Sequence, residues 1–224
     1  MDELGYIHQL IVPFFGHELT FNIKVIAMVW IVMAILIVFA LFTTRNRGLV
    51  PGRMQIVGEL LVTQLYALTE DALDEKLGRK LAPMICALFM FLVMSNYMGV
   101  IPFMEEPTKD LNVPLSLGIM GFVIAHFFGI KQKGLRAYVK GYMEPFFILL
   151  PLNLIGELAK VISISFRLFG NIMGGSIIIL VVSHLVYSLI LPPFLCFFFG
   201  LFVGTIQAFV FTMLTIVYVS VQIK

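Results

Sequence analysis

Long uncharged apolar runs divide the chain into segments that match the thickness of a membrane. Residues 25–44, 81–104 and 114–130 contain no Asp, Glu, Lys or Arg. About twenty apolar residues, rising about 1.5 Å each in a helix, cross the roughly 30 Å hydrocarbon core of a bilayer. The pattern therefore predicts three membrane-spanning helices at these positions.

A different periodicity lies between the first two of these runs. Over residues 54–78, apolar side chains recur on one stripe of a helix and polar side chains on the opposite stripe. The apolar stripe comprises Val57, Leu61, Leu65, Leu68 and Ala72, and the polar stripe comprises Glu59, Thr63, Glu70 and Asp74. This pattern predicts an amphipathic helix that lies on the inner membrane surface.

Two longer apolar segments, residues 146–189 and 194–223, follow and are separated by a Pro-Pro pair. At about 1.5 Å per residue, the first is much longer than a bilayer is thick, so it must be steeply tilted, kinked or laid along the membrane plane. We expect the two segments to pack as a hairpin. The pairs Gly170/Gly174 and Gly200/Gly204 have the four-residue spacing that lets helices approach closely.

Composition agrees with this pattern. Of the 224 residues, 60% are hydrophobic and 12% are charged, and a soluble domain of this length cannot bury so much apolar surface. We therefore predict one all-α integral membrane domain over residues 1–224, with five to six helices. The bilayer is an expected partner and nucleic acid is not. Cys86 and Cys196 stand apart in apolar runs and predict neither a disulfide nor a metal site.

The charged loops predict how the chain crosses the membrane. Basic residues cluster after the first span and again after the third, and such clusters stay on the cytoplasmic side. Residues 1–24 are then external and the C-terminus is cytoplasmic. The acidic start has no basic head, so no cleavable signal is expected. The outer acids Glu105, Glu106 and Asp110 belong either to a solvated loop or to an entry that concentrates cations.

Polar residues form a stripe on each of the two long segments. Asn153, Glu157, Lys160, Arg167 and Asn171 fall within about 80° of one another at 100° per residue. The facing stripe comprises Gly200, Gly204, Gln207 and Tyr218. Glu157 and Lys160 are either a structural i,i+3 ion pair or part of a site. Asn171 and Gln207 are either an interhelical hydrogen bond or part of the same site.

Arg167 is the residue for which a purely structural role is the least satisfactory explanation. A guanidinium at membrane depth costs about 2.5–3.5 kcal/mol on insertion scales, and arginine cannot lose its proton to avoid that cost. The nearest acid before it is Glu157, ten residues away. An unpaired cation here predicts a partner on another chain, or water.

The order of motifs identifies a resemblance. The stretches "SNYMGVIPF", "TKDLNVPLSL", "GIKQKG", "PLNLIGELAK", "SISFRLFGNIMGG" and "GTIQAFVFTMLTIVYVS" resemble subunit a of the F-type ATP synthase. The resemblance implies a non-catalytic stator subunit of a bacterial cytoplasmic membrane, facing a rotating ring of c subunits and contacting peripheral stalk subunit b. It also implies two aqueous half-channels, H⁺ or Na⁺ as the transported cation, and no cofactor.

The resemblance further implies residue roles. Arg167 corresponds to the essential arginine of the family, Asn171 and Gln207 to channel amides, and Asn96 to an amide of an earlier helix. Residues expected to line the half-channels are Asn96, Asn153, Glu157, Lys160, Asn171, Ser176, Gln207 and Tyr218. The sequence departs from many proton-driven relatives at Gly99, Ser176 and Gly200, where they carry titratable side chains. This shortage favours sodium as the coupling ion, because a sodium ion needs oxygen ligands more than titratable groups.

Two other classes of protein were considered. A secondary ion transporter is disfavoured by the surface helix, by the lack of an internal repeat and by the single unpaired arginine. An intramembrane hydrolase would use His184 with Ser183 or Ser188, but these residues lie too close in one helix to form a nucleophile and base with a third orienting group.

Overall fold

The structure is a computed structural model that describes residues 9–14, 17–45, 52–101, 104–143, 149–185 and 191–223. Within these ranges, five segments are long and apolar enough to cross a membrane. They are Ile23–Thr44, Glu75–Val100, Asn112–Lys133, Leu150–Leu185 and Leu191–Ile223. The prediction of an all-α integral membrane protein is confirmed for this helical part.

A feature that the sequence pattern did not predict precedes the first helix. Strands β1 (Gln9–Phe14) and β2 (His17–Asn22) pair antiparallel, with Gln9 opposite Asn22. Helix α1 (Ile23–Thr44) begins directly after β2, and the Asn22 side chain accepts a hydrogen bond from the Lys24 amide at 3.2 Å. This bond caps one of the free amides at the helix start. On α1, large apolar side chains such as Trp30 are exposed, as in a helix that faces lipid.

Helix α2 (Arg53–Ala72) and helix α3 (Glu75–Tyr97) are joined by a two-residue turn. The predicted amphipathic segment 54–78 is therefore shorter in the structure, and the next helix begins before residue 81. A Cβ on Gly78 would lie 2.8 Å from the Glu70 Cα, so glycine allows this tight turn. Arg79 bridges it by ion pairs of 3.1 Å to Glu70 and 3.2 Å to Glu75. The charged residues 75–80 thus form the first turns of α3, which continues into the 3-10 turn η1 (Met98–Val100).

Helix α4 (Asn112–Lys133) packs against the C-terminal helices through small residues. A side chain at Gly118 would overlap the Ser165 hydroxyl, and one at Gly129 would lie 2.8 Å from the Tyr138 ring. Gly134, with φ +81, ends α4 and leads into helix α5 (Leu135–Met143). A 3-10 turn, η2 (Pro107–Lys109), precedes α4.

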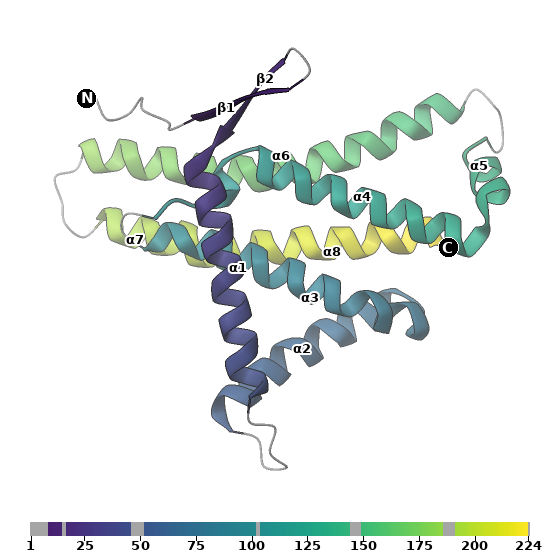
Figure 1. The fold of residues 1–224 in the computed structure, drawn as a ribbon, viewed down its shortest axis with the longest axis horizontal. Coiled ribbons are helices and arrows are strands. Elements are labelled where there is room, and N and C mark those ends of the chain that lie inside the picture. The colour runs from purple at the N-terminus through teal and green to yellow at the C-terminus, as the bar shows by residue number, and fades with distance from the viewer. Residues whose placement is uncertain are drawn as a thin grey trace.

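The two long C-terminal segments are present. Helix α6 (Leu149–Leu185) is continuous over 37 residues. The second segment consists of α7 (Leu191–Phe197), a π-helical part η3 (Phe198–Val203) and α8 (Gly204–Ile223). In Figure 1, α6 and α8 run alongside each other and crosswise to α1. If α1 crosses the bilayer, α6 and α8 lie at a steep tilt, as their length requires. The predicted ends at 146–148 and 186–189 lie outside the described residues.

Candidate functional site: polar groups on both sides of Arg167

Arg167 lies on an outward face of α6. Ile164, Leu168 and Ile172 are buried on the flanking face, whereas Arg167 and Phe166 are exposed. Within the described part of the chain, the guanidinium makes no hydrogen bond or ion pair. The sequence predicted that this cation has no partner on the same chain, and in the described part of the fold it has none.

The surface next to Arg167 is open. A Cβ on Gly170 or on Gly174 would meet no atom within 4 Å, so these glycines contact no other described helix. The prediction that this pair packs two helices of the chain together is wrong for that reason, since α8 does not cover this face of α6. Close approach to the second segment occurs instead at Gly175, where a Cβ would lie 2.9 Å from the Phe199 ring.

One turn beyond Arg167, a polar contact joins the two long helices. The Asn171 amide donates to the Gln207 Oε1 at 2.7 Å. Gln207 is only 4% exposed, and its Nε2 has no partner among the described residues. The geometry matches the interhelical hydrogen bond considered for this pair, and it leaves one buried donor available beside the arginine face.

A polar cavity lies toward the start of α6. Its volume is about 420 Å³, and its polar lining comprises Lys133, Tyr138, Tyr142, Asn153, Glu157, Lys160 and Gln222. Glu157 and Lys160 form an ion pair of 2.6 Å at its edge, and the Lys160 ammonium lies 5.8 Å from the Tyr218 ring centre. Asn153 donates to the Tyr142 carbonyl at 3.0 Å and so ties α6 to α5. Four residues of the predicted lining thus meet at or beside one cavity.

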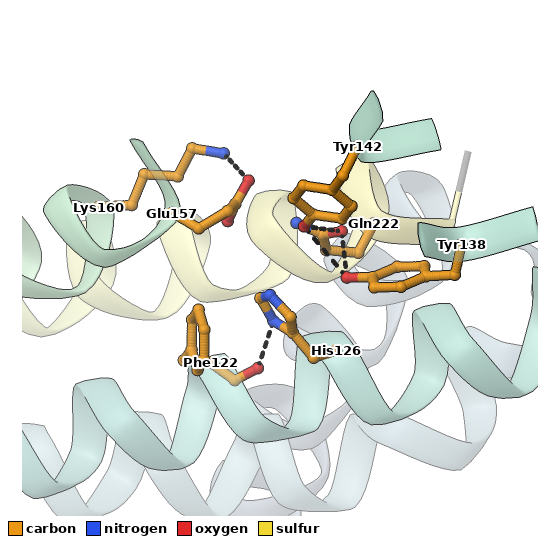
Figure 2. Close-up of polar contacts among 7 residues, drawn as sticks. All are labelled: Phe122, His126, Tyr138, Tyr142, Glu157, Lys160 and Gln222. Carbon is orange, nitrogen blue, oxygen red and sulfur yellow. Dashed lines mark hydrogen bonds and ion pairs between the residues drawn. The ribbon is translucent and has the colours of Figure 1, made fainter. Parts of the chain in front are cut away.

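Two tyrosines and a glutamine form the end of this cavity (Figure 2). Both hydroxyls donate to the Gln222 Oε1, from Tyr138 at 2.7 Å and from Tyr142 at 3.0 Å. Burial, together with the Tyr142 hydroxyl, raises the pKa of Tyr138 well above its ordinary value. Tyr138 is therefore a permanent hydrogen-bond donor at neutral pH and does not titrate there. Figure 2 also shows His126 below this cluster, with its Nδ1 2.9 Å from the Phe122 carbonyl oxygen.

Asn96 occupies a buried junction. It is fully buried, donates to the Gly204 carbonyl at 2.8 Å and accepts from the Thr108 hydroxyl at 2.8 Å. A Cβ on Gly204 would lie 2.9 Å from the Asn96 Cβ, and one on Gly200 would overlap Val100. The pair Gly200/Gly204 does permit close packing, as predicted, but its partners are α3 and η1 rather than α6.

Glu106 is not part of a solvated loop. The neighbouring Pro107 and Thr108 are buried, and the Ser176 hydroxyl donates to the Glu106 Oε2 at 3.4 Å. A Cβ on Gly99 would overlap the Glu106 carboxylate. Burial raises the pKa of Glu106, and this effect outweighs the attraction of Lys109 and the hydrogen bond from Ser176. The region that seemed to lack titratable groups at Gly99 and Ser176 therefore holds a carboxyl group.

These clusters flank Arg167 along α6. Ser176 is nine residues after it and Glu157 ten residues before it, which corresponds to about 14 Å and about 15 Å along a helix. Among the described residues, no group of three or more His, Cys, Asp or Glu could hold a metal ion. The arrangement is a fixed, exposed cation between two polar clusters on one apolar helix.

Comparison with known proteins identifies the family. The family model described as "ATP synthase A chain" matches residues 26–220. This chain belongs to that family. It is 35% identical to ATP synthase subunit a of Moorella thermoacetica over 191 residues, which cover 85% of this chain and 86% of the relative.

Further relatives agree with this assignment to the A chain family. ATP synthase subunit a 2 of Syntrophotalea carbinolica is 38% identical, with 85% of this chain and 82% of the relative covered. Subunit a of Bacillus subtilis is 34% identical over 230 residues, with 92% and 94% covered. The chain is thus a multi-pass membrane protein of bacterial type, and it belongs to a non-catalytic family. The resemblance inferred from the motifs is confirmed.

The sequence analysis did not assign Tyr138, Tyr142 or Gln222 to the site, and it named Glu106 only as an outer acid, in a solvated loop or at a cation entry. Gln222 follows Tyr218 by four residues and so continues the polar stripe of the last segment, a signal that was available. Tyr138 lies in a short helix, and Glu106 lies between helices, where no periodicity indicates which side chains turn inward. Their positions become evident only from the packing of α5 on α4 and α6, from the Tyr138–Gln222 hydrogen bond and from the packing of η2 on α6.

Proposed function

We propose that this chain is the ion-conducting stator subunit of an F-type ATP synthase. It provides two aqueous half-channels, faces the c-ring with Arg167, contacts peripheral stalk subunit b and couples H⁺ or Na⁺ flow to rotation of the ring. In this proposal, it sits in the bacterial cytoplasmic membrane with its N-terminus outside and its C-terminus cytoplasmic. It has no catalytic site and holds no cofactor.

The observation that carries the proposal is Arg167, which is exposed and has no partner among the described residues, on a helix whose other exposed side chains are largely apolar. A cation held at membrane depth needs an anion or water to offset its desolvation. A carboxylate on the ring, which in lipid is neutral or loaded with an ion, is such a partner. Beside Arg167 its pKa falls and its hold on a bound ion weakens.

The same charge explains why ions would not pass straight through. A fixed guanidinium between two polar paths repels a cation that tries to move directly from one to the other. The cavity lined by Glu157 and Gln222 supports an inner half-channel, and the Glu106–Ser176 contact supports an outer one. Transfer between them then requires the ring carboxylate to carry the ion around.

Replacement of Asn171 or Gln207 by leucine is expected to slow ion transport several-fold without preventing assembly. Each change removes the 2.7 Å bond between α6 and α8, and the leucine cannot solvate an ion. The measurement is ATP-driven ion uptake into vesicles, with the amount of assembled complex determined in the same membranes. Asn112→Leu, an exposed amide that bonds only to Asp110, is the control. Unchanged uptake would mean that the pair serves only to hold the two helices together.

The coupling ion is a separate question. The sequence argument for sodium rested on the shortage of titratable groups, and the half-buried carboxyl group of Glu106 beside Ser176 removes part of its basis. If sodium is the ion, millimolar sodium stimulates ATP hydrolysis, and a protonophore enhances sodium uptake by relieving an opposing voltage of about 2.3 kcal/mol per charge per 100 mV. Proton coupling predicts the opposite: uptake that collapses with protonophore and activity indifferent to sodium. Labelled-sodium uptake into proteoliposomes, with and without protonophore, separates the two.

A further inference from the structure

Glu106 is half-buried and is held in place by the segment around it. Thr108 is fully buried and its hydroxyl donates to Asn96, which fixes η2 against the end of α3. The Glu106 carboxylate then occupies the space beside Gly99 and reaches Ser176 on α6. It therefore stands between the end of the α3 segment and the second half of α6, on the outer side in the proposed topology.

Few neighbouring groups offset the negative charge of the Glu106 carboxylate. Within the described part of the chain it makes no ion pair within 4 Å, and its hydrogen-bond donor is the neutral Ser176 hydroxyl. The charged group that acts on it is Lys109 of η2, and the Cys196 thiol of α7 lies near enough to be affected by Glu106. A half-buried carboxylate without a paired cation is less favourable than one in water.

A purely structural role does not require this acid. Glutamine has nearly the same shape, accepts a hydrogen bond from Ser176 equally well and carries no charge to desolvate. What glutamate adds is the ability to take up a cation and to release it. Its partner Ser176 lies nine residues after Arg167 on α6, about 14 Å along the helix, a distance that a chain of several ordered waters can span.

We propose that Glu106 is the cation-accepting group of the outer half-channel. It binds one cation from the outer solution, releases one cation toward the ring carboxylate near Arg167, and returns to its starting charge. This role rests on the proposed function and specifies one residue of that path. For a proton the carboxyl group is the donor and acceptor; for sodium its two oxygens are ligands beside the Ser176 hydroxyl.

Glu106→Gln in the whole complex tests the proposal, and Glu105→Gln is the matched control because Glu105 is adjacent and exposed. The measurement is passive ion conduction by vesicles after the catalytic head is removed, in parallel with ATP-driven uptake by the intact complex. We expect Glu106→Gln to reduce both by at least about ten-fold in fully assembled complex. We expect Glu105→Gln to change neither.

The pH profile distinguishes a transport role from a structural one. Because burial raises the pKa of Glu106, conduction by the parent complex should change with pH across a range above that of an ordinary glutamate. Glu106→Gln should lose this step, and Glu106→Asp should retain it with lower conduction. Normal conduction and an unchanged pH profile in assembled Glu106→Gln would overturn the proposal.

If Glu106→Gln fails to assemble, a second pair of variants tests the proposal by moving the carboxylate to a neighbouring position. The Glu106 side chain fills the space beside Gly99, so its removal makes room there. The double variant Glu106→Ala with Gly99→Asp should regain conduction, whereas Glu106→Ala with Gly99→Ala should not. Equal conduction by the two double variants would overturn the proposal.

Arg167→Ala in the same vesicles separates this inference from the proposed function. If Arg167→Ala loses coupling while Glu106→Gln conducts normally, the stator function stands and the role of Glu106 falls. If Arg167→Ala retains coupled transport, the stator function itself falls.

Discussion

Arg167→Ala is expected to lower ion-driven ATP synthesis by at least about 100-fold, equivalent to about 2.7 kcal/mol. Breaking a desolvated ion pair by removing one partner typically costs about 3–5 kcal/mol. Without the guanidinium, the ring carboxylate has no place to release its ion, and nothing repels an ion that crosses directly. Passive leakage should therefore persist while coupling is lost. The measurement is ATP synthesis in inverted vesicles with an imposed ion gradient.

Arg167→Lys should also be severely impaired. Lysine lacks the planar fork of donors that engages a carboxylate, and desolvation can neutralise it. Hydrolysis by the detached catalytic head should be intact in both variants. Arg136→Ala, which removes an exposed arginine of α5, should synthesise ATP normally. A near-normal synthesis rate in Arg167→Ala vesicles would contradict the proposed function.

Asn96→Ala is expected to destabilise the fold by roughly 2–5 kcal/mol. The Asn96 amide is the partner of the Gly204 carbonyl and of the Thr108 hydroxyl. Each buried polar group left without its partner costs about 1–3 kcal/mol, and the truncated side chain leaves a cavity. The thermal unfolding midpoint of the purified complex and the amount of assembled subunit in membranes should both fall.

Asn112→Ala is the control for this prediction. Asn112 is an exposed amide at the start of α4, so its loss should change neither the unfolding midpoint nor the assembly. If Asn96→Ala assembles and melts like the parent complex but conducts ions poorly, Asn96 serves the channel and its structural contacts are dispensable.

The sequence alone predicted the membrane spans, because the ability of a segment to cross lipid depends on the hydrophobicity of that segment itself. Residues 25–44 became α1 almost residue for residue, and the continuous apolar pattern of the C-terminal third became the long helix α6. Elements defined by packing between distant segments were not predictable in the same way. The break between α2 and α3 depends on Gly78 meeting Glu70, and periodicity does not record that contact.

The same contrast holds within the site. The isolation of Arg167 and the contact of Asn171 with Gln207 follow from helical spacing on two facing stripes, and the structure contains both. Four-residue glycine spacing, however, occurs both at Gly170/Gly174, which face open space, and at Gly200/Gly204, which are buried. Spacing indicates that a helix has a flat patch, but the neighbour that covers the patch is set by the tertiary fold.

The length of α6 also affects how the chain is made. During synthesis α6 is complete before α8, because Ile223 is added 38 residues after Leu185. At about 5–20 residues per second, this delay is roughly 2–8 seconds. In that interval Asn171 has no Gln207 to bind, and a steeply tilted helix with Lys160 and Arg167 cannot enter lipid as an ordinary independent span. The nascent helix therefore needs shelter at the membrane insertion machinery until the final helix is complete, and chains that stop short of α8 should be degraded rather than inserted.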